Sequence, residues 1–249
     1  MPELATTSKS GRYYEWGGVR YPSVTTILGG GIPKPALVAW AKRVTAEAAI
    51  ASLNTLPGLL AEKGERAVIQ ALTKRPEKEA EAAAVIGTAV HAAIEQYAKG
   101  GELGPWPEEA EPFRASFTRF LEEKSPVFEL SEFTVFNLEA GYAGTADAAC
   151  RFPGRDGVTL LDVKTGKGVY PEVALQLAAY AYGEFIGRPD GSEVLPEFSD
   201  FEVLHVRPDA YELVPVRVDL DTFATFLAVK DVFEWVRVTS KFALGGSAK

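Results

Sequence analysis

The stretch Val158–Lys167, which reads VTLLDVKTGK, decides how this sequence is interpreted. Its apolar run, rich in β-branched residues, ends at Thr165-Gly166, a pattern typical of a buried strand that runs into a turn. Because successive side chains of a strand alternate between its faces, Asp162 and Lys164 are expected to point the same way. A carboxylate and an ammonium group on an apolar strand are costly unless both have partners. The stretch alone fits a structural ion pair and a functional site equally well.

The rest of the chain predicts a mixed α/β sheet with flanking helices. After Pro126 the apolar residues change from helical spacing to alternation, which marks the start of the sheet. The predicted strands cover about 127–137, 142–152, 158–165, 201–206 and 211–218, after an N-terminal hairpin at 13–21. The predicted helices cover about 36–53, 59–73, 77–99, 107–124, 171–186 and 220–242, after a short helix that Ser23 caps and the glycines at 29–31 end. We expect residues 1–75 to form a hairpin and helical lobe that covers a cleft, and residues 76–249 to form the core.

Composition and charge exclude several classes of protein. The 249 residues are 47% hydrophobic and 24% charged, as in ordinary globular domains. The single cysteine, Cys150, excludes an intramolecular disulfide and a four-cysteine iron–sulfur cluster. No apolar run is long enough to span a bilayer and no signal peptide is recognisable, so the expected location is the cytoplasm. A net charge of −8 argues against a protein that coats DNA nonspecifically, but it leaves room for a nucleic-acid enzyme with a local cation site.

The hairpin between the second and third strands of the sheet makes a geometric prediction. If residues 153–156, Pro-Gly-Arg-Asp, form its turn, Phe152 faces Gly157, and counting back places Asp147 directly opposite Asp162. Directly opposed residues share a face, with Cβ atoms about 5 Å apart. Two carboxylates that close repel each other unless a cation or a shared proton lies between them. A slip of one residue would move Asp147 to the other face, so the register is a sharp test.

The neighbouring ammonium group favours the cation over the shared proton. Lys164 stabilises ionised acids, and two carboxylates with backbone carbonyls and water form the hard oxygen site that Mg²⁺ or Mn²⁺ prefers. Such a metal polarises a phosphoryl oxygen and lowers the pKa of bound water, while the lysine stabilises the transition state. These groups are suited to phosphodiester hydrolysis.

Four motifs in a fixed order resemble a known family. GTAVHAAIE, GYAGTAD, LLDVKTGK and QLAAYAY are similar to the PD-(D/E)XK nuclease superfamily, specifically its RecB-like branch, across residues 87–182. YPSVTTIL and the following helix with Trp40 resemble, more weakly, the N-terminal part of phage-type and mitochondrial genome maintenance exonucleases. Ala146 stands where the superfamily's name expects proline, which is common in this branch. The cluster-binding cysteines of several relatives are absent, and so is a phosphate loop ending in Gly-Lys-Ser or Gly-Lys-Thr, so we expect neither an iron–sulfur cluster nor a nucleotide cofactor.

The resemblance implies a restriction-endonuclease-like core and a role for each motif residue. The implied metal ligands are His91, Asp147, Asp162 and the carbonyl of Val163, and the implied catalytic groups are Lys164, Asp162, Asp147, Gln176 and Tyr180. Gln176 and Tyr180, four apart on one helix face, would hold DNA or the attacking water. The candidates for further DNA contacts are Thr165, Lys167 and Lys34. Glu132 is a possible further acidic contributor. Glu95 fits a surface charge or a partner to His91 as well as a ligand, and His205 fits a structural role.

The resulting hypothesis is a Mg²⁺- or Mn²⁺-dependent deoxyribonuclease. We expect an exonuclease on single-stranded or frayed DNA ends, in recombination, repair or phage DNA processing. A structure-specific or restriction-type endonuclease on the same core is one alternative, and a noncatalytic DNA-binding module of a repair complex is another. DNA is the expected partner and a membrane is not, while a recombination or repair protein is a further partner without a motif of its own.

Overall fold

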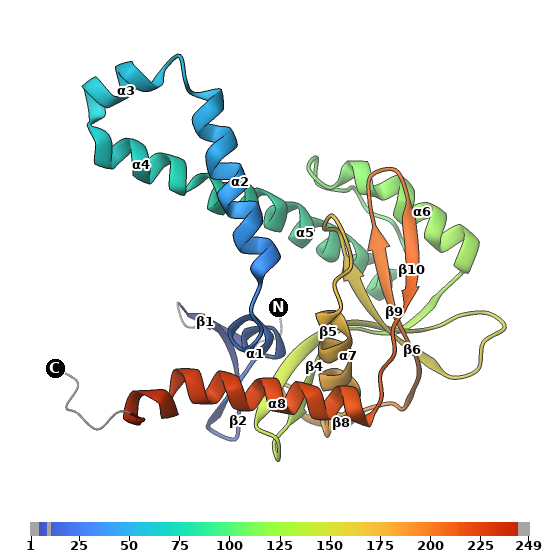
Figure 1. Cartoon of the computed structure of the whole chain (residues 1–249). Helices are drawn as coiled ribbons and strands as arrows, with labels where there is room; N and C mark the ends of the chain where they lie inside the picture. Colours follow the sequence, from blue (N-terminus) through green and yellow to red (C-terminus); the bar gives the residue numbers. More distant parts are fainter. Residues whose placement is uncertain (1–4, 9–10, 244–249) are drawn as a thin grey trace. The chain divides into compact units, whose positions relative to one another are not determined.

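The chain folds into two compact units. The computed structural model describes residues 5–8 and 11–243 (Figure 1). One unit comprises Met1–Ile32 with Ala89–Lys249, and the other comprises Pro33–Thr88. The sequence prediction grouped the N-terminal hairpin with the helical lobe, whereas the contacts group it with the sheet. The reason is packing, because Val24 and Ile27, in the helix after the hairpin, are fully buried in the main core.

The larger unit is built on a seven-stranded sheet in the order β10-β9-β6-β5-β4-β7-β8 (Figure 1). Its strands are β4 (Val127–Asn137), β5 (Tyr142–Arg151), β6 (Val158–Lys164), β7 (Phe185–Arg188), β8 (Gly191–Val194), β9 (Phe198–Val206) and β10 (Tyr211–Pro215). β6 and β9 run parallel, and the other neighbouring strands run antiparallel. The predicted mixed α/β architecture is confirmed. A second, three-stranded sheet consists of β1 (Ala5–Ser8), β2 (Gly11–Trp16) and β3 (Val19–Pro22), of which β2 and β3 form the predicted hairpin.

The register between β5 and β6 agrees with the count from the turn. Ala148 pairs with Leu161, and Cys150 pairs with Thr159, as a turn at residues 153–156 requires. Away from the turn, the last paired residues are Ala148 and Leu161, although β5 extends back to Tyr142 and β6 extends to Lys164. Asp147 and Asp162 are therefore the first residues beyond the point where the two strands part.

Helices pack against the sheet and against one another. They are α1 (Val24–Gly31), α5 (Arg75–Gly100), α6 (Glu111–Lys124), α7 (Glu172–Ala181) and α8 (Leu220–Arg237), with the one-turn 3₁₀ helix η1 (Thr239–Phe242) after α8. α1 and α7 contact β5 and α8, while α6 contacts β9 and β10. The Tyr142 hydroxyl, buried in this core, donates a hydrogen bond of 2.8 Å to the Ala179 carbonyl of α7. α5 begins in the smaller unit and ends in the larger one, which contains its last twelve residues.

The glycines after Ile27 do not end α1 as predicted. Ser23 caps the helix by accepting a hydrogen bond from the Thr26 amide, as expected, but the helix continues through Gly31. A Cβ atom on Gly30 would lie 2.7 Å from Phe233, and one on Gly31 would lie 2.6 Å from the Val229 carbonyl oxygen. The glycines thus allow α1 to approach α8 closely, a packing role that overrides their preference for a turn.

Two other helix predictions are wrong, one at its end and one in its middle. The helix predicted over 171–186 stops at Ala181, and the chain then forms the unpredicted hairpin of β7 and β8. Gly183 permits this turn, because a Cβ there would lie 2.0 Å from Val135. The helix predicted over 59–73 is broken at Gly64, whose φ of +79° is a conformation that favours glycine.

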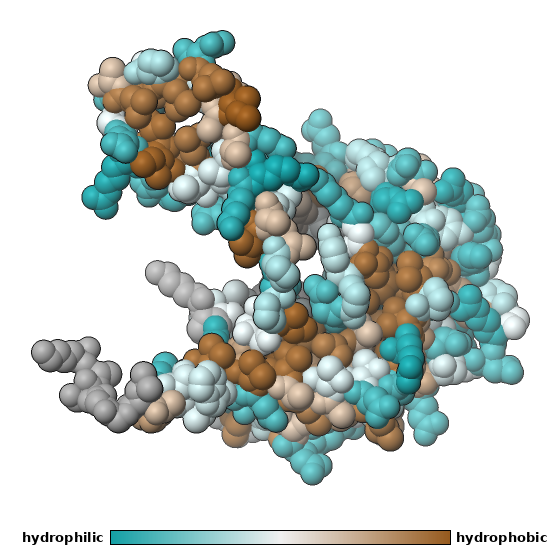
Figure 2. Space-filling model, in the orientation of Figure 1, coloured by the Kyte–Doolittle hydropathy of each residue, from teal (hydrophilic) through white to brown (hydrophobic). Residues whose placement is uncertain are grey.

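The smaller unit is helical. It contains α2 (Pro35–Ala51), α3 (Leu56–Lys63), α4 (Glu65–Thr73) and the first part of α5. Figure 2 shows apolar side chains gathered in this unit, and a hollow within it is lined by residues that include Ala51, Leu56, Leu59, Val68 and Leu72. Among the described residues no single helix has the length and apolarity to cross a membrane, although α2 and α3, bent by 97°, pass that test as a pair.

The contact between α1 and α8 predicts opposite effects for two alanine substitutions in one helix. Gly31→Ala should lower the free energy of unfolding by about 1–3 kcal/mol, because the methyl group overlaps Val229. Gly29→Ala is the matched control. No atom lies within 4 Å of a Cβ at Gly29, so the better helix propensity of alanine should raise the free energy of unfolding by about 0.5–1 kcal/mol. Urea titration measures both, and equal effects of the two substitutions would contradict the packing described.

Candidate metal centre

Three side chains from three elements converge where β5 and β6 part. His91 comes from α5, Glu132 from β4 and Asp147 from β5, and one ligand atom from each lies within 4.8 Å of the other two. The Nδ1 atom of His91 is 3.6 Å from Oδ1 of Asp147. All three side chains are partly exposed, so an ion can reach them from solvent.

Glu132 owes its place in this group to an unusual backbone conformation. Its φ is +47°, in the left-handed region that non-glycine residues rarely adopt. Ser131 pairs with Ala148 and Phe133 pairs with Ala146, so Glu132 is the residue of β4 that is left out of the ladder opposite Asp147. Burial raises the pKa of Glu132 to about 7, and the charge of Asp147 adds to the rise. Such strain clusters at functional sites, although it does not by itself assign a function.

The side chain of Asp147 replaces a backbone carbonyl as the acceptor of a hydrogen bond between β5 and β6. Its Oδ2 atom accepts a hydrogen bond of 2.7 Å from the backbone amide of Val163, just beyond the last paired residues of β6. This contact fixes the carboxylate and leaves Oδ1 toward His91. The N–H and C=O of one residue in a strand face the same neighbouring strand. Because the Val163 amide faces Asp147 of β5, the Val163 carbonyl faces β5 as well. Its role as a metal ligand stays a prediction.

Asp162 is the most buried acid of the site, with 1% of its surface exposed. Its Oδ1 atom accepts hydrogen bonds of 2.9 Å from both Lys164 Nζ and Gln176 Nε2. Its Oδ2 atom lies 2.7 Å from Lys164 Nζ, but this contact is an ion pair without hydrogen-bond geometry, and Oδ2 accepts no hydrogen bond from the described residues. Burial raises the pKa of Asp162, and Lys164 opposes that rise.

Lys164 and Tyr180 keep their protons in this environment. Burial acts to lower the pKa of Lys164, but the charges of Asp162 and Asp147 raise it above its usual value. Burial raises the pKa of Tyr180 well above the usual value, so its phenol stays neutral. Gln176 Nε2 donates to Asp162 Oδ1 and thereby links α7 to the acids of the sheet, and it also donates weakly to the Tyr180 hydroxyl, at 3.4 Å.

These residues fit a divalent cation. The donor set is two carboxylates with an imidazole, and hard oxygen ligands with one nitrogen suit Mg²⁺ or Mn²⁺. The buried Asp162 Oδ2, which lacks a hydrogen-bond donor, offers a further lone pair beside them. The structure therefore brings the predicted His91, Asp147 and Asp162 into one region. It adds Glu132 to the closest group, and Asp162 lies outside that group, held by Lys164.

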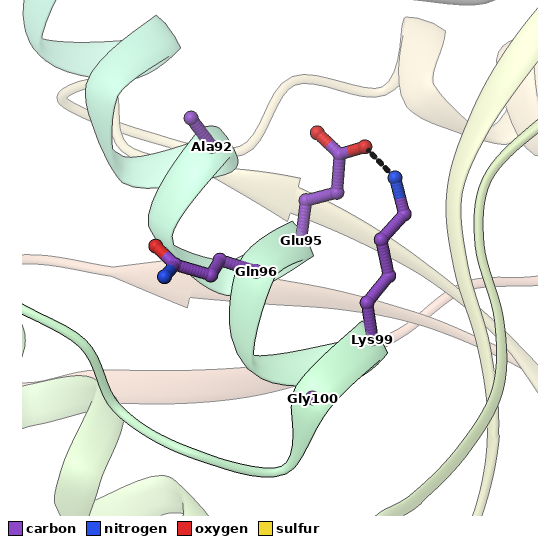
Figure 3. Close-up of a pocket in the computed structure, with 5 residues that line it drawn as sticks. All are labelled: Ala92, Glu95, Gln96, Lys99 and Gly100. Carbon is purple, nitrogen blue, oxygen red and sulfur yellow. Dashed lines mark hydrogen bonds and ion pairs between the residues drawn. The ribbon is translucent and has the colours of Figure 1, made fainter.

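The other candidate DNA contacts are spread over both units. Thr165 and Lys167 lie in the segment that joins β6 to α7, and Lys167 is exposed. Lys34 precedes α2 in the smaller unit. Glu95, one turn after His91, donates no ligand to the closest group and instead pairs with Lys99 at the pocket shown in Figure 3. The charge of Glu95 also acts to raise the pKa of Glu132, so its role stays a prediction.

His205 holds the segment that follows Lys164. The residue is 3% exposed and is paired with Lys164 across the parallel strands β6 and β9. Its Nε2 atom lies 2.7 Å from the carbonyl oxygen of Gly166, and Arg207 Nη1 lies 3.5 Å from its Nδ1 atom. A carbonyl accepts and a guanidinium donates, so Nε2 carries the proton. The structural role expected of His205 is therefore to fix the turn between Lys164 and α7.

No family model matches this chain, and no curated protein matches it either. The resemblance to the RecB-like nucleases consequently depends on the four motifs and on the geometry described above.

Replacing Glu132 by glutamine tests the charge balance of the group. A carboxyl whose folded pKa is raised adds most to stability below its unfolded pKa of about 4.5, and that contribution is lost as the pH rises to about 7. In EDTA at pH 8, Glu132→Gln should therefore raise the free energy of unfolding by about 1 kcal/mol, and below pH 4.5 it should have little effect.

Mn²⁺ should reverse this ranking. At pH 8 the ion should raise the melting temperature of the unsubstituted chain and much less that of Glu132→Gln, because only the carboxylate is a strong ligand. Ser131→Ala, one residue away, is the matched control and should respond like the unsubstituted chain. Equal Mn²⁺ stabilisation of all three proteins would rule Glu132 out as a ligand.

Replacing His205 tests whether its hydrogen bond to the Gly166 carbonyl stabilises the turn after Lys164. His205→Leu leaves the Gly166 carbonyl without its protein donor, which costs about 0.5–1.5 kcal/mol, the contribution of an ordinary hydrogen bond, because Gly166 is exposed to water. Amides 165–170 should then exchange hydrogen faster with solvent. His205→Gln retains an amide donor and should keep most of the protection. Unchanged exchange in the leucine variant would show that the turn does not depend on this hydrogen bond.

Proposed function

We propose that this protein is a Mg²⁺- or Mn²⁺-dependent deoxyribonuclease with a restriction-endonuclease-like core. The observation that carries the proposal is the convergence of His91, Glu132 and Asp147 next to a buried Asp162–Lys164 pair. Carboxylates that accept a divalent ion beside a fixed ammonium group are suited to phosphodiester hydrolysis. The four motifs in RecB-like order support DNA as the substrate.

The contacts of each residue suggest which residues would bind the metal ion. His91, Glu132 and Asp147 would hold the ion, with Asp162 and the Val163 carbonyl beside them. When bound, the ion polarises a phosphoryl oxygen and lowers the pKa of water.

Lys164, Asp162, Gln176 and Tyr180 would stabilise charge and orient the reacting groups. Lys164 stays protonated and supplies positive charge next to the phosphate as negative charge develops on it. Asp162 holds Lys164 and Gln176 in place by hydrogen bonds, so their orientation is set before substrate binds. Tyr180, a neutral phenol beside Gln176, can donate a hydrogen bond to a phosphate or water oxygen.

Attack at DNA ends is the mode that the motif resemblance favours. An exonuclease needs a free end, whereas an endonuclease cleaves a closed circle. A time course on end-labelled linear and circular single strands, with and without Mn²⁺, separates the two. We expect loss of the linear strand only in the presence of the ion, and the circle should persist.

Lys164→Ala tests whether the site is catalytic. The variant should lose cleavage by about 10²–10³-fold or more, as expected when a group that stabilises the transition state is removed, while binding of single-stranded DNA should remain measurable. Lys124→Ala, an exposed lysine in the last turn of α6, is the control and should retain most of the rate of cleavage.

The opposite outcomes are as clear. Cleavage that survives in Lys164→Ala would show that the activity resides elsewhere. If the unsubstituted chain binds DNA but cleaves no form of it with Mn²⁺, the protein is a noncatalytic DNA-binding module.

A further inference from the structure

Arg12 is fixed in an unusual setting within the N-terminal hairpin. Its amide donates a hydrogen bond of 2.9 Å to Thr26 Oγ1, and its carbonyl accepts from the Ser23 amide at 3.0 Å and from the Thr26 hydroxyl at 3.2 Å. The preceding Gly11 leaves no room, since a Cβ there would lie 2.5 Å from Thr26. The first turn of α1 therefore holds the backbone of Arg12 on both sides.

The side chain of Arg12 is exposed, in contrast to its backbone. No ion pair joins its guanidinium to another described residue, whereas most arginines of the larger unit are paired with an acid or stacked on a ring. An exposed, unpaired guanidinium on a backbone held this firmly is available to a ligand and needs little ordering when the ligand binds.

The hairpin directs Arg12 toward the candidate metal centre. Side chains alternate along β2, so Arg12 shares a face with Tyr14, whose hydroxyl lies 2.8 Å from Thr145 Oγ1 of β5. Two residues further along β5, on the same face as Thr145, is Asp147. Ser23, the hydrogen-bond partner of Arg12, forms a parallel bridge with Ala143, so the chain at the end of β3 runs in the same direction as β5. β2 is antiparallel to β3 and therefore runs opposite to β5. The step from Tyr14 back to Arg12 consequently goes in the direction from Thr145 to Asp147.

We infer that Arg12 binds a phosphate of the DNA strand next to the metal-binding group. Its planar fork of N–H donors matches two phosphate oxygens, which is the preferred way in which arginine recognises phosphate. The inference rests on the proposed function and extends it, because it assigns to the N-terminal hairpin a part in holding the substrate that none of the four motifs contains.

Salt dependence of binding is the appropriate measurement. In a Lys164→Ala background, which prevents cleavage, a fluorescent single-stranded oligothymidine is titrated at several salt concentrations with Mn²⁺ present. Adding Arg12→Ala should weaken binding about ten-fold at low salt and reduce the slope of log K against log salt by about 0.7, the value for one lost phosphate contact. Arg12→Lys should keep the slope and lose part of the affinity, because it retains the charge without the fork.

Arg20 provides the matched control. It lies on the same hairpin but opposite Glu15, on the other face of β2, and its guanidinium stacks 4.6 Å from the Tyr13 ring. Arg20→Ala should leave both affinity and slope as in the background protein.

The outcomes separate the inference from the proposed function. If the background protein binds the oligonucleotide and Arg12→Ala binds it with the same affinity and slope, the inference fails and the nuclease proposal stands. If Arg12→Ala weakens Mn²⁺ binding as much as DNA binding, Arg12 serves the metal site and the inference is again wrong. If the unsubstituted chain neither binds nor cleaves DNA, both fall together.

Discussion

The hydrogen bond from the Val163 amide to the Asp147 carboxylate is the contact on which the candidate site depends. Up to Ala148 and Leu161 the strands β5 and β6 are joined by their backbones, and from there a side chain takes over as acceptor. This substitution satisfies an amide that would otherwise lose its partner where the ladder ends. It also fixes an acid at the gap between two strands, which is where the other polar groups of the site meet.

Charge determines which protonation states the site can adopt. Glu132, Asp147 and Asp162 are three acids in one region, and the ammonium group of Lys164 contacts only the last of them. Burial makes the imbalance costly, as the raised pKa of Glu132 shows. A divalent cation would relieve the repulsion between Glu132 and Asp147 without displacing Lys164 from Asp162. The same arrangement thus accounts for the raised pKa of Glu132, and it would suit the proposed metal ion.

Local sequence signals were enough to predict part of this arrangement. The turn at residues 153–156 fixed the register of β5 and β6, because a short hairpin loop leaves few ways to pair its strands. His91, Asp147, Lys164 and Gln176 lie in one region, and it was the resemblance to the RecB-like nucleases, not a local signal, that grouped them.

Tertiary packing decided the features that the sequence did not reveal. Glu132 was named from the sequence as a further acidic contributor, but the left-handed backbone conformation through which it reaches the group was not, because a glutamate gives no signal for it. The glycines that were predicted to end α1 instead allow α8 to pack closely against it. This role depends on the positions of both helices, which the local sequence does not give. Arg12 lies far from the motifs in sequence and is brought to them by hydrogen bonds with Thr26 and by the contact of Tyr14 with Thr145.

The most direct test of the central claim is the location of a bound metal. Anomalous X-ray diffraction from crystals soaked in Mn²⁺ should show a peak contacted by His91, Glu132 and Asp147, with Lys164 still paired to Asp162. A saturating soak that leaves no peak at these residues, or one that places manganese only elsewhere on the protein, would contradict the account.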